Sequence, residues 1–278
     1  MLSKRLVSTA TICLLLAAGT AACGDNKDKE TAAAPAPTTA ATSAASTPTA
    51  TPTPTPTVAK LDTDKLTAQE IEKQAKDALA AATAVKIVAD MKTEEGKLSF
   101  NLALDRKGQC QGTMAMPGMG SFDIISDGKQ AYIKPDAQVW KTFGGPKGDA
   151  IAELFKGRWL TGFQDDAKMK GLTSSCNLAD MSKEMMADDT PSTASKGTAG
   201  TVNGVKTFSL KEKDENGEES LLHIATEGKF YPVRMEKTTG KETGQVDFTD
   251  FDKPLTLQLP SPDNIVDYSK FQTQLKSA

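Results

Sequence analysis

Hydrophobic residues in the middle of the chain repeat first with a helical period. Ile71, Ala75 and Leu79 recur at four-residue spacing, which predicts an amphipathic helix that packs one face on a sheet. Just before them, Thr67 and Glu70 have the spacing of a capping box, in which each residue bonds the backbone amide of the other. We therefore expect the helix to begin at this point.

After residue 85 the period changes to two, the alternation of an antiparallel strand with one buried face. The clearest strand is 98–105, and turn pairs such as Glu95-Gly96 separate it from its neighbours. The same pattern predicts strands at 85–91, 98–105, 110–116, 121–125 and 130–134, and then at 205–211, 220–226, 230–237, 244–251 and 255–259.

The stretch 135–189 loses the alternation and contains two predicted helices, 149–155 and 177–186. A long antiparallel sheet has to bury its apolar face against a second layer, and amphipathic helices are available here. We predict an α+β fold for residues 61–278: a strongly curved antiparallel half-barrel of about 10–11 strands, with the helices covering its concave apolar face.

The first 60 residues follow neither pattern. Lys4 and Arg5 precede an apolar run, 6–18, that is too short to span a bilayer, so we expect residues 1–22 to be an export signal. Residues 24–60 are mainly Ala, Thr, Ser and Pro, a composition that forms no core and favours extended polyproline II. This part is predicted to be a disordered tether.

Cys23 follows Ala21 and Ala22 directly, and this end of the apolar run resembles the lipobox of bacterial lipoproteins. In that family the cysteine receives a diacylglyceryl group and becomes the new N-terminus, which implies fatty acylation, palmitate included, and anchorage to the outer face of the cell membrane. Thr20 departs from the pattern, because the family usually has Leu or Val there. The alternative is an ordinary secretory signal in which Cys23 has no role.

Charge and motif content argue against several classes of function. The 278-residue chain has a net charge of -3, so it lacks the basic character of a nucleic-acid-binding protein. His223 is the only histidine and lies in a predicted strand, and no phosphate loop or nucleophile elbow occurs. Asp247, Asp250 and Asp252 lack the glycine turn and bidentate Glu of a calcium loop. We expect no catalytic residue, metal or cofactor.

Apart from Cys13 and Cys23 of the signal region, two cysteines remain, Cys110 and Cys176. In the oxidising compartment of an exported protein, such a pair most simply forms a disulfide. A metal or redox pair is the alternative, although neither cysteine belongs to a CxxC motif.

Seven of the ten methionines lie between Met114 and Met186. Methionine is flexible and polarisable, so this concentration fits either plain core filling or an apolar cavity between the sheet and the helices. On the second interpretation, the predicted cavity lining comprises Ile87, Phe100, Leu102, Met114, Met116, Phe122, Ile124, Tyr132, Trp140, Leu154, Leu178, Met181, Met185, Leu222 and Ile224.

Three short stretches carry a family resemblance. The segments 108–114 (GQCQGTM), 131–134 (AYIK) and 228–234 (GKFYPVR), with Trp140 after the second, resemble actinobacterial lipoproteins of the LppX/LprG type in the LolA-like group. The resemblance covers roughly 66–271. It implies a half-barrel wrapped over helices, an apolar cavity that holds acyl chains, and the disulfide pair Cys110 and Cys176, which some relatives contain.

These observations favour a non-enzymatic, monomeric protein that binds or carries a lipid or other amphiphile and is held at the membrane by Cys23. The alternative is a sensor or scaffold that uses the same fold to bind another envelope protein. The acidic segment 214–219 is the candidate surface for such a partner. An enzyme is the third class considered.

Overall fold

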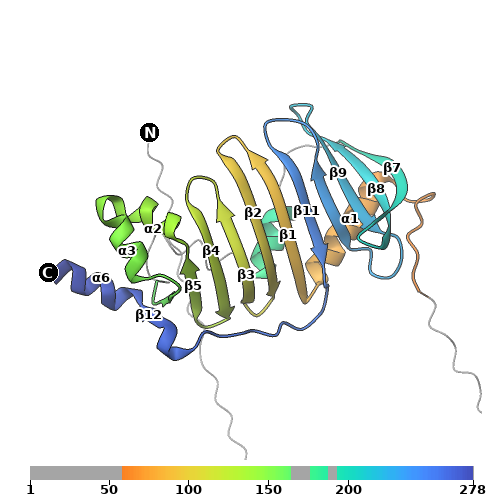
Figure 1. The fold of residues 1–278 in the computed structure, drawn as a ribbon. Helices are drawn as coiled ribbons and strands as arrows, with labels where there is room; N and C mark the ends of the chain where they lie inside the picture. Colours follow the sequence, from red (N-terminus) through yellow and green to blue (C-terminus); the bar gives the residue numbers. More distant parts are fainter. Residues whose placement is uncertain (1–57, 164–175, 187–192, 278) are drawn as a thin grey trace, which may run out of the picture. The chain divides into compact units, whose positions relative to one another are not determined.

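Twelve strands form one curved sheet that does not close into a barrel (Figure 1), within a computed structural model that describes residues 58–163, 176–186 and 193–277. The strand order is β12-β6-β5-β4-β3-β2-β1-β11-β10-β9-β8-β7, and only β6 and β12 pair in parallel. The strands are β1 Ala84–Thr93, β2 Gly96–Asp105, β3 Gln109–Met116, β4 Gly120–Asp127, β5 Ala131–Pro135, β6 Trp159–Thr161, β7 Thr193–Val202, β8 Val205–Lys213, β9 Glu219–Ala225, β10 Pro232–Lys237, β11 Thr243–Thr249 and β12 Ile265–Asp267.

Helices cover one face of this sheet. The helices are α1 Ala68–Ala81, α2 Ala137–Gly144, α3 Gly148–Leu154, α5 Leu178–Met186 and α6 Tyr268–Ser277, with short 3-10 turns at Gly145–Lys147 and Pro262–Asn264. Figure 1 shows α1 behind the β8 to β11 part of the sheet, and α2, α3 and α6 at the β5 end. The predicted α+β half-barrel with helices on its concave face is confirmed, with twelve strands in place of about 10–11.

Helix α1 begins where the capping box predicts. The Thr67 amide donates to Glu70 Oε2 at 2.7 Å, and the Glu70 amide donates to Thr67 Oγ1 at 3.2 Å. Its apolar side, including the fully buried Ile71, packs against Leu210 and Ile224 of β8 and β9. The helix therefore covers one end of the concave face.

The largest difference from the sequence prediction is the segment 255–259, for which the predicted strand is wrong. Leucine alternates with polar residues there, but the segment crosses the convex face of the sheet and pairs with no strand (Figure 1). Alternation requires only that one side of an extended chain be covered, so it does not show that a neighbouring strand is present. Strands β6, β7 and β12 were missed; β6 and β12 are three residues long, and β7 is an exposed edge rich in Thr, Ala and Gly.

Two of the sequence predictions concern parts of the chain outside the described residues. The export signal 1–22, Cys23 and nearly all of the tether 24–60 fall there, so their acylation and spacer roles stay predictions. Across the described ranges, we find no helix with the length and apolar character needed to cross a membrane.

Candidate functional site

The strand register aligns apolar side chains into two rows on the concave face. The open row is Met235, Val246, Ala89, Phe100 and Met114, on β10, β11, β1, β2 and β3 in that spatial order. The buried row, two residues away along each strand, is Phe248, Ile87, Leu102, Ile124 and Ile133, with Gly112 between Leu102 and Ile124.

The two rows differ in exposure. All five side chains of the buried row are within 1% of full burial, so this half of the face is filled by the protein's own packing. In the open row Phe100, Met114 and Val246 are only partly buried and Met235 is 36% exposed, while the small Ala89 between Val246 and Phe100 is buried. Apolar side chains that stay partly exposed side by side are candidates for a binding surface, so the open row is the candidate site.

The predicted cavity residues divide accordingly. Phe100, Met114, Met116 and Met181 are half-buried and pack against the main apolar cluster. Leu222 and Ile224 belong to a second cluster under α1, away from the 135–189 insertion. Most of the other predicted residues lie buried in the main cluster: Ile87, Leu102, Phe122, Ile124, Trp140 and Leu178.

Two of the predicted lining residues are wrong, and one is not described. Leu154, the last residue of α3, is 64% exposed and turned away from the cluster. Tyr132 is buried, but strand alternation places it on the face opposite Ile133, where its hydroxyl donates to Gln130 Oε1 at 3.0 Å. The side chain of Met185 lies outside the described residues.

Sequence reasoning missed Met235, Val246 and Ala89 in the open row. The strand pairing shifts between Pro232 and Arg234, which reverses the alternation along β10 and moves Met235 to the concave side. Val246 had a readable signal, because it alternates with Phe248 along β11. A bulge has no comparable signature, so Met235 could not be assigned to a face from the sequence.

A disulfide fixes α5 to this face. Cys110 of β3 and Cys176 are bonded and fully buried, with their Cα atoms 5.2 Å apart. Beside this bond, Asn177 forms a parallel bridge with Asp105, and its side chain accepts from the Ala179 amide to start α5. The bond therefore holds the first turn of α5 against the sheet, and the predicted pairing is confirmed.

Helix α2 is held against the sheet near the Met114 end of the open row. Asp136 Oδ1 accepts from the Val139 amide at 2.9 Å, and Asp136 Oδ2 accepts from the Ser121 amide and hydroxyl. Burial raises the pKa of Asp136, but these hydrogen bonds outweigh it and hold the pKa below its usual range. A Cβ on Gly120 would lie 2.8 Å from the Val139 nitrogen, so α2 approaches the sheet closely here.

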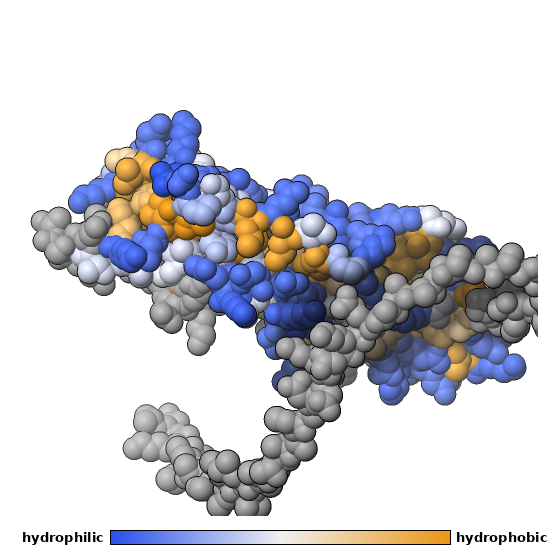
Figure 2. Space-filling view, turned by 90° about the horizontal axis from the view of Figure 1, so that it is seen from below, coloured by the Kyte–Doolittle hydropathy of each residue, from blue (hydrophilic) through white to orange (hydrophobic). Residues whose placement is uncertain are grey.

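Aromatic rings fill the space behind α2. Trp140 stacks on Phe155 with ring centroids 5.0 Å apart, and Phe155 meets Phe271 edge-on at 4.7 Å. Figure 2 shows apolar atoms gathered at this end of the molecule. The open row therefore ends against an aromatic wall.

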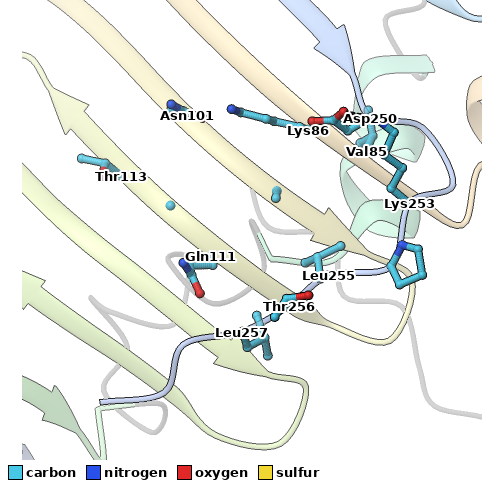
Figure 3. A pocket seen from close by; sticks show the side chains of 13 residues that line it. Val85, Lys86, Asn101, Gln111, Thr113, Asp250, Lys253, Leu255, Thr256 and Leu257 are labelled. Atoms are coloured by element: carbon cyan, nitrogen blue, oxygen red, sulfur yellow. Dashed lines mark hydrogen bonds and ion pairs between the residues drawn. The ribbon is translucent and has the colours of Figure 1, made fainter. Parts of the chain in front are cut away.

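The convex face carries a different hollow of about 460 Å³, between the 253–259 segment and β1 to β3 (Figure 3). Its walls include Lys86, Asn101 and Thr113 from the sheet, and Leu255 and Leu257 from the crossing segment. Because polar groups form much of its wall, it does not suit an acyl chain.

Asp252 fastens this crossing segment. Its carboxylate accepts from the Thr83 amide at 2.8 Å, from Lys229 Nζ at 2.6 Å and from the Tyr231 hydroxyl at 2.6 Å. The Lys229 hydrogen bond, followed by those from Thr83 and Tyr231, holds the pKa of Asp252 well below its usual range. Three separate parts of the chain thus meet at one carboxylate.

We expect Asp252→Asn to lower the free energy of unfolding at neutral pH by about 2 kcal/mol, because the charge-assisted bonds are lost. Since the pKa is lower in the folded state, the stabilisation is present above about pH 4 and lost as the pH falls further. Urea denaturation across pH 2–7 should show the difference between the variant and the wild type shrinking below pH 4.

Asp250→Asn is the matched control for that experiment. Asp250 has the same left-handed backbone, φ 53° against 59° for Asp252, but its carboxylate forms an exposed pair with Lys253 at 2.6 Å. An exposed pair of this kind contributes about 0.5 kcal/mol. Equal losses in the two variants would refute the fastening role of Asp252.

The acidic and histidine residues considered for chemistry do not form a reactive constellation, and the buried Nε2 of His223 has no hydrogen-bond partner among the described residues. Arg234 holds Asp247 with two bonds of 2.6 and 3.1 Å. His223 is half-buried on the convex side, with Nε2 3.8 Å from Glu236 Oε1. In the ranges that the structure describes, no three His, Cys, Asp or Glu side chains gather as a metal site would require.

Comparison with known proteins gives similarity in solved structures but none in sequence. The chain is similar to lipoprotein LppX of Mycobacterium tuberculosis (11% identity, 69% of this chain and 98% of that chain, TM-score 0.44). It is similar to LprF from Mycobacterium bovis (11%, 70% and 97%, TM-score 0.48) and to the LolA superfamily protein NE2245 from Nitrosomonas europaea (10%, 70% and 96%, TM-score 0.25). No family model and no curated protein sequence matches the chain.

Proposed function

We propose that this protein is a non-enzymatic lipoprotein of the cell envelope that binds an amphiphile, a lipid or an acylated molecule, on the concave face of its half-barrel. The single observation that carries the proposal is the partly exposed open row beside a fully packed buried row. Burial of apolar surface contributes about 25 cal/mol per Å², so one acyl chain laid along this row would be held without any polar contact.

The proposed anchor gives a role to the long tether between Cys23 and the folded domain. A diacylglyceryl group on Cys23 would keep the binding domain at the outer face of the membrane, and the Ala/Thr/Pro-rich tether would let it move above the bilayer. A monomer suffices for this role, because the open row belongs to one chain.

The alternative is a scaffold that binds an envelope protein, with the acidic segment 214–219 as its surface. The charges there are largely engaged within the chain. Asp214 Oδ1 accepts from the Asn216 and Glu218 amides, and Glu218 pairs with Lys237 at 2.7 Å. A hairpin that uses its acidic groups for its own turn offers less to a partner, so we favour the amphiphile.

Native mass spectrometry of the purified protein, followed by titration with an apolar fluorescent dye, tests the proposal. We expect a co-purifying amphiphile of lipid mass, and dye fluorescence that this amphiphile suppresses by competition. A protein that carries no such mass and leaves the dye unchanged would contradict the proposal. A stoichiometric protein partner from intact envelopes, with no lipid, would favour the scaffold.

A further inference from the structure

The indole N–H of Trp140 is a buried donor without an acceptor. Trp140 is 8% exposed and is the one residue of α2 that is buried. Its Nε1 has no hydrogen-bond partner among the described residues. Buried tryptophan nitrogens usually have a partner, because leaving a donor unpaired away from water is costly. This donor therefore calls for a specific explanation.

The position of α2 places that donor at one end of the open row. Gly120, which α2 approaches closely, pairs with Met116, and Met116 lies two residues from Met114 on the same face of β3. Met114, Met116 and Phe100 all pack against the cluster that contains Trp140. A chain lying along the open row toward α2 would therefore run toward the cluster that contains Trp140.

The surroundings of Trp140 indicate which acceptor would fit. Its ring packs on Phe155, and the cluster that contains it is built from apolar side chains. The nearest charge along α2, Lys141, pairs with Asp149 at 3.0 Å. A carboxylate or phosphate placed here would be a buried charge in apolar surroundings, so a neutral carbonyl oxygen is the less costly acceptor.

We propose that Trp140 Nε1 donates a hydrogen bond to the ester or amide carbonyl of a bound amphiphile, with the acyl chain running from α2 along the open row. This inference rests on the proposed function and adds an orientation to it. The carbonyl end of the ligand lies at the β5 end of the sheet, where α2, α3 and α6 are found. Its acyl chain points toward β10.

The test compares two apolar probes, methyl laurate and pentadecane, which differ in having or lacking a carbonyl. In ¹⁵N-labelled protein we expect methyl laurate to move the Trp140 indole proton downfield, and pentadecane to leave it near its free position. Trp159→Phe assigns the two indole signals, since the chain has two tryptophans. It also serves as the matched control, because Trp159 lies on β6 beneath Lys134 and outside the aromatic wall.

Affinity gives the second readout. We expect Trp140→Phe to lower the ratio of ester to alkane affinity about fivefold, the value of one neutral hydrogen bond, whereas Trp159→Phe leaves the ratio unchanged. If both probes bind but the Trp140 signal does not respond to the ester, or the ratio survives in Trp140→Phe, this inference is overturned and the proposed function stands. If neither probe binds, both are overturned. The wild-type spectra decide the question even if Trp140→Phe does not fold.

Discussion

Replacing Cys110 and Cys176 together with alanine should lower the free energy of unfolding by roughly 4 kcal/mol. The bond joins residues separated by 66 positions, and on the chain-entropy model a closed loop of that length restricts the unfolded chain by about this amount. Both sulfur atoms are buried, so the change also removes apolar contacts beneath α5. Urea denaturation at neutral pH measures the loss.

Reduction provides the control for this prediction. A strong reductant should move the wild-type unfolding midpoint toward that of the Cys110→Ala/Cys176→Ala variant and leave the variant itself where it is. Because the disulfide holds the start of α5 on the concave face, the variant should also bind apolar dye differently. An unchanged midpoint after complete reduction would show that the bond does not stabilise the fold.

The second large effect is expected for Met114→Lys in the open row. Met114 lies between Phe100 and Phe122 in the register, so an ammonium group there would meet a bound acyl chain without a counter-ion. We expect affinity for the co-purified amphiphile to fall about 100-fold, equivalent to about 3 kcal/mol. Isothermal titration or dye competition measures the change.

Thr113→Lys is the matched control, because Thr113 is the neighbouring residue on the same strand and points to the opposite face. Its hydroxyl bonds Asp123 at 2.8 Å, so a lysine there would find a carboxylate within reach. We expect this variant to bind like the wild type. Equal losses in the two variants would mean that the face of the sheet does not matter, which would contradict the proposed site.

How far the sequence predicts this fold depends on which signals are local. The capping box of Thr67 and Glu70 and the alternation in β2 are local patterns, and the structure confirms both. The crossing segment 255–259 has the same alternation as a strand. It lies against the convex face instead, where the Gln111 side chain accepts a hydrogen bond from the Gln258 amide. Such a long-range contact has no counterpart in the local pattern.

Only those residues of the candidate site that follow a local pattern could be predicted from the sequence. Phe100 and Met114 follow from strand alternation, because β2 and β3 are regular throughout. Met235 depends on a bulge in β10, and Tyr132 is buried on the convex side, where alternation alone cannot tell the two covered faces apart. Trp140 was predicted to line the cavity and lies buried in the apolar cluster, and its unpaired nitrogen becomes apparent only once its neighbours are known.

The central claim is that the open row holds an acyl chain. A photoreactive fatty-acyl ester with a diazirine in its chain, bound to the purified protein and irradiated, tests this most directly by peptide mass mapping. We predict labelling in β2 and β3 at Phe100 and Met114, reduced by an excess of the co-purified amphiphile. Labelling confined to convex-face residues such as Asn101 and Thr113, or labelling that the amphiphile does not reduce, would contradict the account.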